Sequence, residues 1–328
     1  MEHDRKTVVV SGIRATGRLH IGNYFGAIRN FPPLQDHACF FFVADYHTLT
    51  TNPDPEHLQL HRLPIVKAFL ACGIDPKRAT IYLQSDLPET TELATLLSML
   101  VTKGELERCT TFKEKAKNSP DEVSLGLLAY PVLMAADILI HRGTLVPVGE
   151  DQMQHLEMTR DFAGRFNRRY KGRGFSFALP KALPHSAIRL PGLDGKKMGK
   201  SDGNTIDLLD DGETIATKVR RAITDPQRMR RDDPGSPERC VSVYPIHTLV
   251  TADAELEEVK AGCKSGTISC SDCKAKLATN LTRALAPIRE RHHEIKDTFV
   301  RDVLYDGAIK ARESAREVIV GARQTMGF

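Results

Sequence analysis

Four cysteines in the second half of the chain have the spacing expected of ligands to one metal centre. Cys240, Cys263, Cys270 and Cys273 follow the pattern C-x22-C-x6-C-x2-C. The last pair can bind one metal from a tight turn, and two further thiolates complete a four-thiolate shell. Both zinc and a [4Fe-4S] cluster accept such a shell, so the spacing alone leaves the metal open.

Two glycine-containing segments have the composition of phosphate-binding loops. SGIRATGRLHIGN, residues 11–23, follows an apolar run and leads into a helical pattern, where backbone amides and the helix dipole bind phosphate. GKKMGKSDG, residues 195–203, carries lysines at 196, 197 and 200 that could neutralise a polyphosphate. Taken singly, the first segment is also typical of tight packing and the second of a solvated surface turn.

A carboxylate stands within an otherwise apolar helical segment, YPVLMAADIL. Helical spacing places Tyr130, Met134 and Asp137 on one face. A buried carboxylate needs a partner, and a donor-only indole N–H, a tyrosine hydroxyl or the local backbone could supply it. The residues alone leave that choice open.

Short β-branched runs alternate with helical patterns in the first half of the chain. We expect strands at 7–10, 39–44, 80–83 and 145–148. We expect helices at 20–30, 56–71, 89–101, 124–140 and 151–166. This alternation predicts an α/β fold with a Rossmann-like, doubly wound parallel sheet. Residues 168–200 are expected to be irregular, the later part helical, and 297–326 a long helix.

Composition and charge limit the classes of protein. The 328 residues are 41% hydrophobic and 27% charged, which excludes global disorder. No apolar run approaches the roughly 18 residues that a membrane span needs, and the N-terminus lacks a signal-peptide pattern. The net charge of +4 is too small to indicate a nucleic-acid partner. We expect a soluble, cytoplasmic protein.

The motifs together resemble one family. HIGN and KMGKS resemble the HIGH and KMSKS signatures of class I aminoacyl-tRNA synthetases, and YPVLMAADIL and VPVGEDQ resemble bacterial tryptophanyl-tRNA synthetases. The resemblance covers essentially the whole chain. It implies activation of L-tryptophan with ATP and Mg²⁺, transfer to tRNA(Trp), and a homodimer. It also implies a catalytic domain at 1–203, a helical anticodon-binding domain at 204–295 and a C-terminal helix at 296–328 that packs back on the catalytic domain.

One departure supports an alternative function. Gly199 stands where the family has the middle serine of KMSKS, and this change removes a hydroxyl from the loop. A paralogue with weak activation that binds RNA or a partner is the alternative. Arg14 also stands where many relatives have glutamine, and it could pair with a phosphate or a carboxylate.

The resemblance implies roles for individual residues. His20, Asn23, Lys197 and Lys200 would be catalytic. The ATP-binding residues would be Arg14, Ala15, Thr16, Gly22, Asn23, Gly149, Glu150, Asp151, Leu190, Lys197, Met198, Gly199, Lys200 and Ser201.

The amino-acid site follows from the same resemblance. Asp137 would bind the indole nitrogen and Tyr130 the ammonium group. The ring would pack on Met134, Val146 and Val148, while His47 and Gln152 would orient the amino acid.

The resemblance also favours a [4Fe-4S] cluster over zinc at the four cysteines, because some tryptophanyl-tRNA synthetases carry this spacing. Lys264, Lys274 and Lys276 lie near these cysteines in sequence, and basic stretches occupy 160–173 and 218–231. Basic residues release counterions from phosphates, so these segments are candidates for contact with tRNA.

Overall fold

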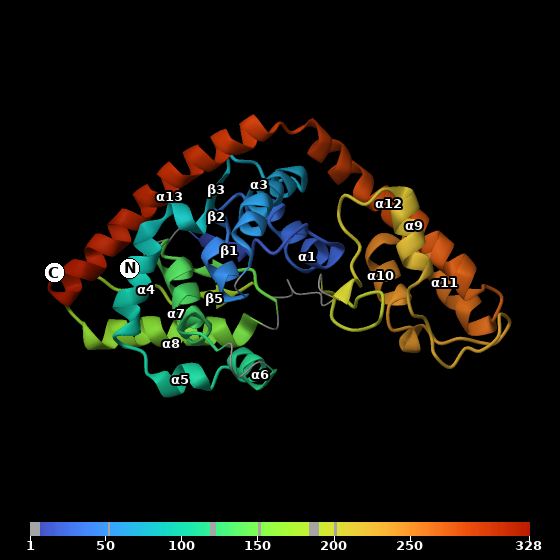
Figure 1. Ribbon diagram of the computed structural model, residues 1–328, viewed down its shortest axis with the longest axis horizontal. Helices are drawn as coiled ribbons and strands as arrows, with labels where there is room; N and C mark the ends of the chain where they lie inside the picture. Colours follow the sequence, from blue (N-terminus) through green and yellow to red (C-terminus); the bar gives the residue numbers. More distant parts are fainter. Residues whose placement is uncertain (1–6, 52, 119–122, 150–151, 184–189, 200–201) are drawn as a thin grey trace. The chain divides into compact units, whose positions relative to one another are not determined.

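The computed structural model describes residues 7–51, 53–118, 123–149, 152–183, 190–199 and 202–328. The described residues form a parallel sheet of five strands in the order β3-β2-β1-β4-β5, which confirms the predicted α/β class (Figure 1). The strands are β1 (Val8–Ile13), β2 (Ala38–Val43), β3 (Ala79–Leu83), β4 (Leu145–Val146) and β5 (Lys181–Ala182).

The helices of the described residues fall between and after these strands. They are α1 (Ile21–Gly26), α2 (Asp45–Thr48), α3 (Pro55–Ala71), α4 (Pro88–Ser98), α5 (Lys103–Glu107), α6 (Thr110–Asn118), α7 (Leu125–Leu139), α8 (Met153–Arg169), α9 (Gly212–Arg220), α10 (Val243–Val250), α11 (Asp253–Ser265), α12 (Cys270–Glu294) and α13 (Asp297–Met326).

The central strands are apolar on both faces, as expected for a parallel sheet covered by helices. In the register of β1, β2 and β3, Val10 lies beside Phe40 and Phe41 beside Ile81. Several expectations were wrong in detail. The strand predicted at 7–10 extends to Ile13, and the helix predicted at 20–30 ends as α-helix at Gly26. The strand predicted at 145–148 ends at Val146, and β5 lies within the segment expected to be irregular. With only two residues, β5 has too few side chains to show a strand pattern.

The chain's contacts divide into two compact units. The first comprises Met1–Gly17, Asn30–Ala187 and Ile295–Phe328, and the second comprises Arg18–Arg29 and Ile188–Glu294. The sheet belongs to the first unit. The second holds α1 and α9 to α12, and in it α12 packs on α9 and α10 through a stripe of buried leucines and isoleucine. No helix within the described ranges is long and apolar enough to cross a membrane.

The helix α13 packs along β3, α3 and α4 within the first unit (Figure 1). A Cβ atom at Gly307 would collide with the backbone carbonyl of Ile81, so only glycine allows this close approach. Arg312 on α13 pairs with Glu89 on α4, with Nη2 and Oε1 3.2 Å apart. His141, which is 2% exposed, hydrogen-bonds to Ser314 on α13.

Candidate functional site

Asp137 lies on α7 in the first unit, and its carboxylate is 3% exposed. The side-chain amide of Gln84 donates to both carboxylate oxygens, at 2.8 and 2.9 Å. His47 on α2 lies 2.9 Å from Oδ2 through Nε2. Burial raises the pKa of Asp137, and the hydrogen bonds from His47 and Gln84 oppose that rise. A carboxylate has about four acceptor positions, and these three contacts leave one for a further donor.

The aliphatic residues predicted to pack an aromatic ring lie together. Val146 is 2% exposed and forms a small hydrophobic cluster with Ile138 and Leu156, against which Met134 and Val148 pack. This cluster joins α7, the end of β4 and the first turns of α8. Met134 stands three residues before Asp137 on α7, so the cluster against which it packs adjoins the face of the helix that carries the carboxylate.

Tyr130, the predicted ammonium ligand, and Gln152, which was predicted to orient the amino acid, contact the same imidazole. Tyr130 hydrogen-bonds through its hydroxyl to Nε2 of His155, and Gln152 accepts through Oε1 from Nδ1 of His155 at 3.0 Å. Burial raises the pKa of Tyr130 well above its ordinary range, and a hydrogen bond with Cys109 adds to the rise. The hydroxyl therefore stays protonated at neutral pH.

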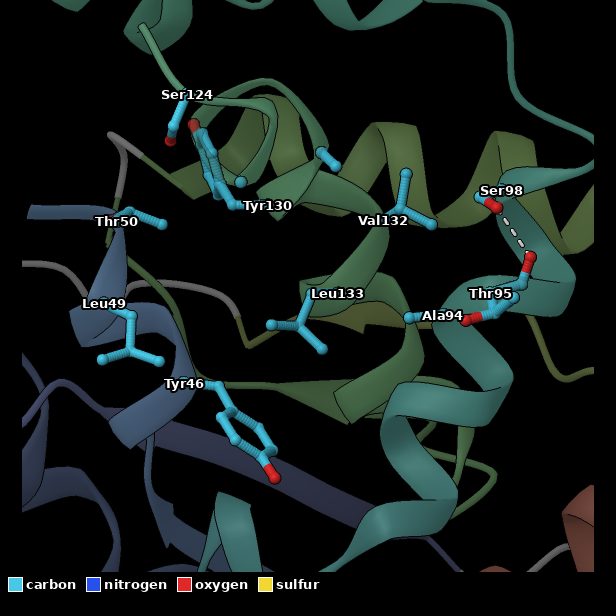
Figure 2. A pocket seen from close by; sticks show the side chains of 12 residues that line it. Tyr46, Leu49, Thr50, Ala94, Thr95, Ser98, Ser124, Tyr130, Val132 and Leu133 are labelled. Atoms are coloured by element: carbon cyan, nitrogen blue, oxygen red, sulfur yellow. Dashed lines mark hydrogen bonds between the residues drawn. The ribbon is translucent and has the colours of Figure 1, made fainter. Parts of the chain in front are cut away.

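A cavity of about 430 Å³ opens beside α7 on the side of Leu133. Figure 2 shows Tyr46 and Leu49 on one side of it and Thr95 and Ser98 of α4 on the other. Tyr130 also borders this cavity. Asp137 and Met134 are not among its lining residues. The cavity thus borders Tyr130 of the predicted amino-acid site and is separate from Asp137.

The loop after β1 places polar backbone and a guanidinium near this site within the first unit. The backbone N–H of Ala15 donates to Thr48 Oγ1 at 2.9 Å, which ties the loop to α2. Arg14 donates to Thr51 at 3.3 Å, but its Nε is buried without a partner among the described residues. Burial lowers the pKa of Arg14, and its nearness to Tyr130 opposes that effect. Thr16 is exposed and Ala15 buried.

The HIGN segment packs against the KMGKS loop in the second unit. The backbone N–H of Asn23 bonds to His20 O, and the Asn23 side chain accepts from the His20 N–H at 3.1 Å. A Cβ atom at Gly22 would lie 2.8 Å from His20 Nδ1 and 3.2 Å from Met198 Sδ. Glycine is required here because the imidazole and the Met198 side chain both approach the backbone. Ile21 N also donates to the carbonyl of Ile206 at 2.9 Å.

Asn204 bonds to the part of the KMGKS loop that the structure describes, and nothing in the sequence singles it out. It is 3% exposed and accepts from the Gly199 N–H at 2.8 Å. Its amide nitrogen donates to Asp194 Oδ1 at 2.8 Å and to the Lys197 carbonyl at 3.1 Å. Lys197 itself is exposed.

Two of the remaining predicted ATP-binding residues lie in the described part of the chain. Gly149 accepts through its carbonyl from the Gln152 N–H at 2.9 Å, and Leu190 is 5% exposed in the second unit. The others lie outside the described residues: Glu150, Asp151, Lys200 and Ser201.

The four cysteines influence one another but do not form a metal shell. Burial raises the pKa of Cys240, Cys263 and Cys273, the last to about 12, and thiolate repulsion within the group adds to each rise. Cys270 accepts from Arg228 Nη1 at 3.7 Å. Among the residues that the structure describes, no group of three or more His, Cys, Asp or Glu side chains could hold a metal ion. The predicted metal site is therefore not shown by the structure.

The lysines near the cysteines have partners in the second unit. Lys264 pairs with Glu238 at 3.5 Å and Lys276 with Glu255 at 3.7 Å. Lys274 donates to the carbonyl of Arg220 at 3.0 Å. The positive charge on this face is thus partly neutralised within the unit.

Comparison with known proteins identifies the family. The profile described as "tRNA synthetases class I (W and Y)" matches residues 1–286. The chain therefore belongs to the class I tRNA synthetases for tryptophan and tyrosine. It is 46% identical to a tryptophan–tRNA ligase of Porphyromonas gingivalis, with 98% of this chain and 99% of that one covered. It is 44% identical to the tryptophan–tRNA ligase of Thermotoga maritima, with the same two shares.

A solved structure agrees with these relatives. The tryptophanyl-tRNA synthetase of Campylobacter jejuni, crystallised with ADP and tryptophan, is 34% identical to the chain. The two superpose with a TM-score of 0.84, and 98% of this chain and 100% of that one are covered. The likeness thus extends over both units.

Proposed function

We propose that the chain activates L-tryptophan with ATP and Mg²⁺ to tryptophanyl-adenylate and transfers the amino acid to tRNA(Trp). The observation that carries this proposal is the buried carboxylate of Asp137, which keeps one acceptor position beside a small apolar cluster. That pairing suits an indole, which is apolar apart from one N–H donor. The family and its tryptophan-specific relatives support the same reading.

The reaction assigns tasks to the residues of both units. Tyr130 and Gln152 take the substrate's ammonium group, and Arg14, with its buried Nε, takes the carboxylate or the α-phosphate. A carboxylate oxygen of tryptophan then attacks the α-phosphate of ATP and pyrophosphate leaves. A tRNA hydroxyl next attacks the adenylate's carbonyl carbon, and AMP leaves. Catalysis is mainly positioning and charge stabilisation.

The HIGN segment and the KMGKS loop bind the phosphates of ATP in this proposal. His20, Asn23 and the exposed Lys197 supply donors and charge, and Mg²⁺, when bound with ATP, would supply further charge neutralisation. We assign the same task to residues outside the described ranges: Glu150, Asp151, Lys200 and Ser201.

ATP–pyrophosphate exchange, measured with tryptophan, tyrosine and phenylalanine in turn, tests the proposal. Exchange with tryptophan alone is the expected result. Exchange with tyrosine would mean that Asp137 accepts a hydrogen bond from a phenolic hydroxyl instead of an indole N–H. If none of the three supports exchange while the protein still binds tRNA, the alternative paralogue is correct, and Gly199→Ser would be the first reversion to test.

We also propose that Cys240, Cys263, Cys270 and Cys273 hold a [4Fe-4S] cluster, with zinc as the alternative. The donor set fits in type and number, because four thiolates suit either metal centre. Other thiols of the group add to the rise in the pKa of Cys240 and of Cys273, which supports a common site, and backbone N–H groups at the start of α10 bond to the Cys240 sulfur. The structure as it stands is not closed into a shell, so the proposal requires the thiols to approach further.

Iron, zinc and acid-labile sulfide content after anaerobic purification tests the cluster. We expect about four irons and four sulfides per chain, and their loss in Cys270→Ser. Cys72→Ser, which changes a buried cysteine of the first unit, is the matched control and should retain both. One zinc per chain without sulfide would replace the cluster, and no metal would refute both.

We also propose that residues 204–295 contact tRNA and that the chain assembles as a homodimer. Lys274→Glu with Lys276→Glu should weaken binding of tRNA and leave adenylate formation unchanged. Analytical ultracentrifugation tests the dimer through the mass of the species in solution.

A further inference from the structure

A buried hydrogen-bonded cluster in the first unit centres on His155, which is 2% exposed in the first turn of α8. Its Nδ1 lies 3.0 Å from Gln152 Oε1, and its Nε2 contacts the Tyr130 hydroxyl. The thiol of Cys109, which is fully buried, lies 3.3 Å from Nε2 and 3.4 Å from the same hydroxyl. One imidazole thus connects two side chains that we assign to the substrate's ammonium group.

The partners fix the direction of these hydrogen bonds. An amide oxygen only accepts, so His155 Nδ1 must carry the proton that bonds to Gln152. In neutral imidazole the other nitrogen is then an acceptor. The Tyr130 hydroxyl, which stays protonated, then donates to that nitrogen and keeps its oxygen lone pairs as acceptors, with the Cys109 thiol 3.4 Å from the oxygen.

This arrangement matches what an ammonium group requires. A –NH₃⁺ group only donates, so its ligands must present acceptors. A hydroxyl that donates its one hydrogen bond to His155 can only accept hydrogen bonds from other groups. A cationic His155 would instead donate from Nε2, release the tyrosine proton toward the substrate and add a positive charge nearby.

We propose that His155 is a positioning residue for the amino-acid substrate: as the neutral, Nδ1-protonated imidazole, it orients Tyr130 and Gln152 to receive the ammonium group. The inference rests on the proposed tryptophan site. His155 does not touch the substrate and acts through the two side chains. Thr159 Oγ1 bonds to the His155 carbonyl at 2.8 Å, and Gln154 accepts from the Thr110 N–H at 2.9 Å, so neighbouring contacts hold the first turn of α8 without the imidazole.

Two ligands that differ only in the ammonium group separate positioning from structural support. L-tryptophan carries the group, and indole-3-propionate has the same ring and carboxylate without it. Dissociation constants of both are measured by calorimetry for the wild type, His155→Leu, His155→Asn and His155→Gln. His57→Leu, the same change at an exposed histidine of α3, is the control.

We expect His155→Leu to weaken tryptophan binding about tenfold and to leave indole-3-propionate within about twofold. His155→Gln places an amide oxygen where Nε2 accepts from Tyr130, so it should recover part of the loss. In steady-state exchange, KM for tryptophan should rise while KM for ATP stays constant. The Gln and Asn variants carry the comparison if His155→Leu does not fold.

Other outcomes overturn the inference. An equal loss for both ligands would mean that His155 only supports the packing of α7 and α8. No loss for either would mean that Tyr130 and Gln152 need no positioning. A wild type that binds indole-3-propionate as tightly as tryptophan would overturn the assigned ammonium ligands, and a wild type that binds neither would overturn the proposed function itself.

Discussion

Replacing Asp137 with asparagine removes one charge and keeps the shape of the side chain. Gln84 donates to both carboxylate oxygens and His47 lies against Oδ2. An amide nitrogen in either position therefore meets a donor. Gln84 could turn its own amide to compensate, but it would then lose the bond that its Oε1 accepts from the His47 N–H at 3.3 Å.

The size of the effect follows from the bond to the indole. A hydrogen bond to a charged acceptor contributes about 1.5–3 kcal/mol, and 1.4 kcal/mol corresponds to a factor of ten. We therefore expect Asp137→Asn to weaken tryptophan binding about 10- to 150-fold. Binding of 3-(benzothiophen-3-yl)alanine, which has sulfur in place of the N–H, should change much less.

The assay compares kcat/KM for the two amino acids in ATP–pyrophosphate exchange. The wild type should prefer tryptophan, and Asp137→Asn should lose most of that preference. Asp36→Asn, which changes an exposed carboxylate paired with Arg78, is the control. If the variant loses activity equally for both amino acids, or keeps its preference for tryptophan, the assignment of Asp137 to the indole nitrogen is refuted.

Two further predictions concern the KMGKS loop and the buried histidine that bonds to α13, His141. Asn204→Ala removes three hydrogen bonds from the loop, so the exchange rate should fall at least tenfold with little change in tryptophan affinity; weaker tryptophan binding, measured by calorimetry, would contradict this. Burial lowers the pKa of His141 to about 3, so the unfolded imidazole binds a proton between that pH and 6.5 that the folded one does not. Above pH 6.5 the neutral imidazole of His141 therefore costs no stability. As the pH falls below 6.5, the free energy of unfolding should decrease by about 1.4 kcal/mol per pH unit. Urea unfolding at several pH values should show a shallower slope for His141→Gln, and an unchanged slope would refute the assignment.

The sequence predicts the strands and helices whose own residues carry a hydrophobic pattern. The runs at β1, β2 and β3 are apolar because both faces of the sheet are covered, and 297–326 has one apolar stripe, so the sequence predicts all four elements. The bounds of β2, β3 and α13 agree within one residue, whereas β1 runs three residues beyond its predicted end. The two-residue strand β5 depends on its pairing with β4 and carries no such pattern. The helix predicted at 20–30 ends as α-helix at Gly26, because the backbone at Ala27 leaves the helical region.

The site was predictable only in part, for the same reason. Motif resemblance pointed to Asp137, Tyr130 and the two loops. Gln84 lies 53 residues from Asp137 in the chain and meets it only through the tertiary fold. The same holds for Cys109 and His155. Glutamine after a strand and histidine inside a helix are common, so nothing local distinguishes them from residues without a role.

The residues that we propose for recognition of the side chain and for recognition of phosphate belong to different units. Asp137, His47 and Gln84 belong to the first unit, while the HIGN segment packs on Met198 in the second. Effects on tryptophan affinity and on ATP use should therefore separate. Asp137→Asn should change the first and Asn204→Ala the second, and the double variant should show the sum of the two free-energy changes, since the two residues share no partner. A large departure from additivity would show that the two sites are coupled during activation.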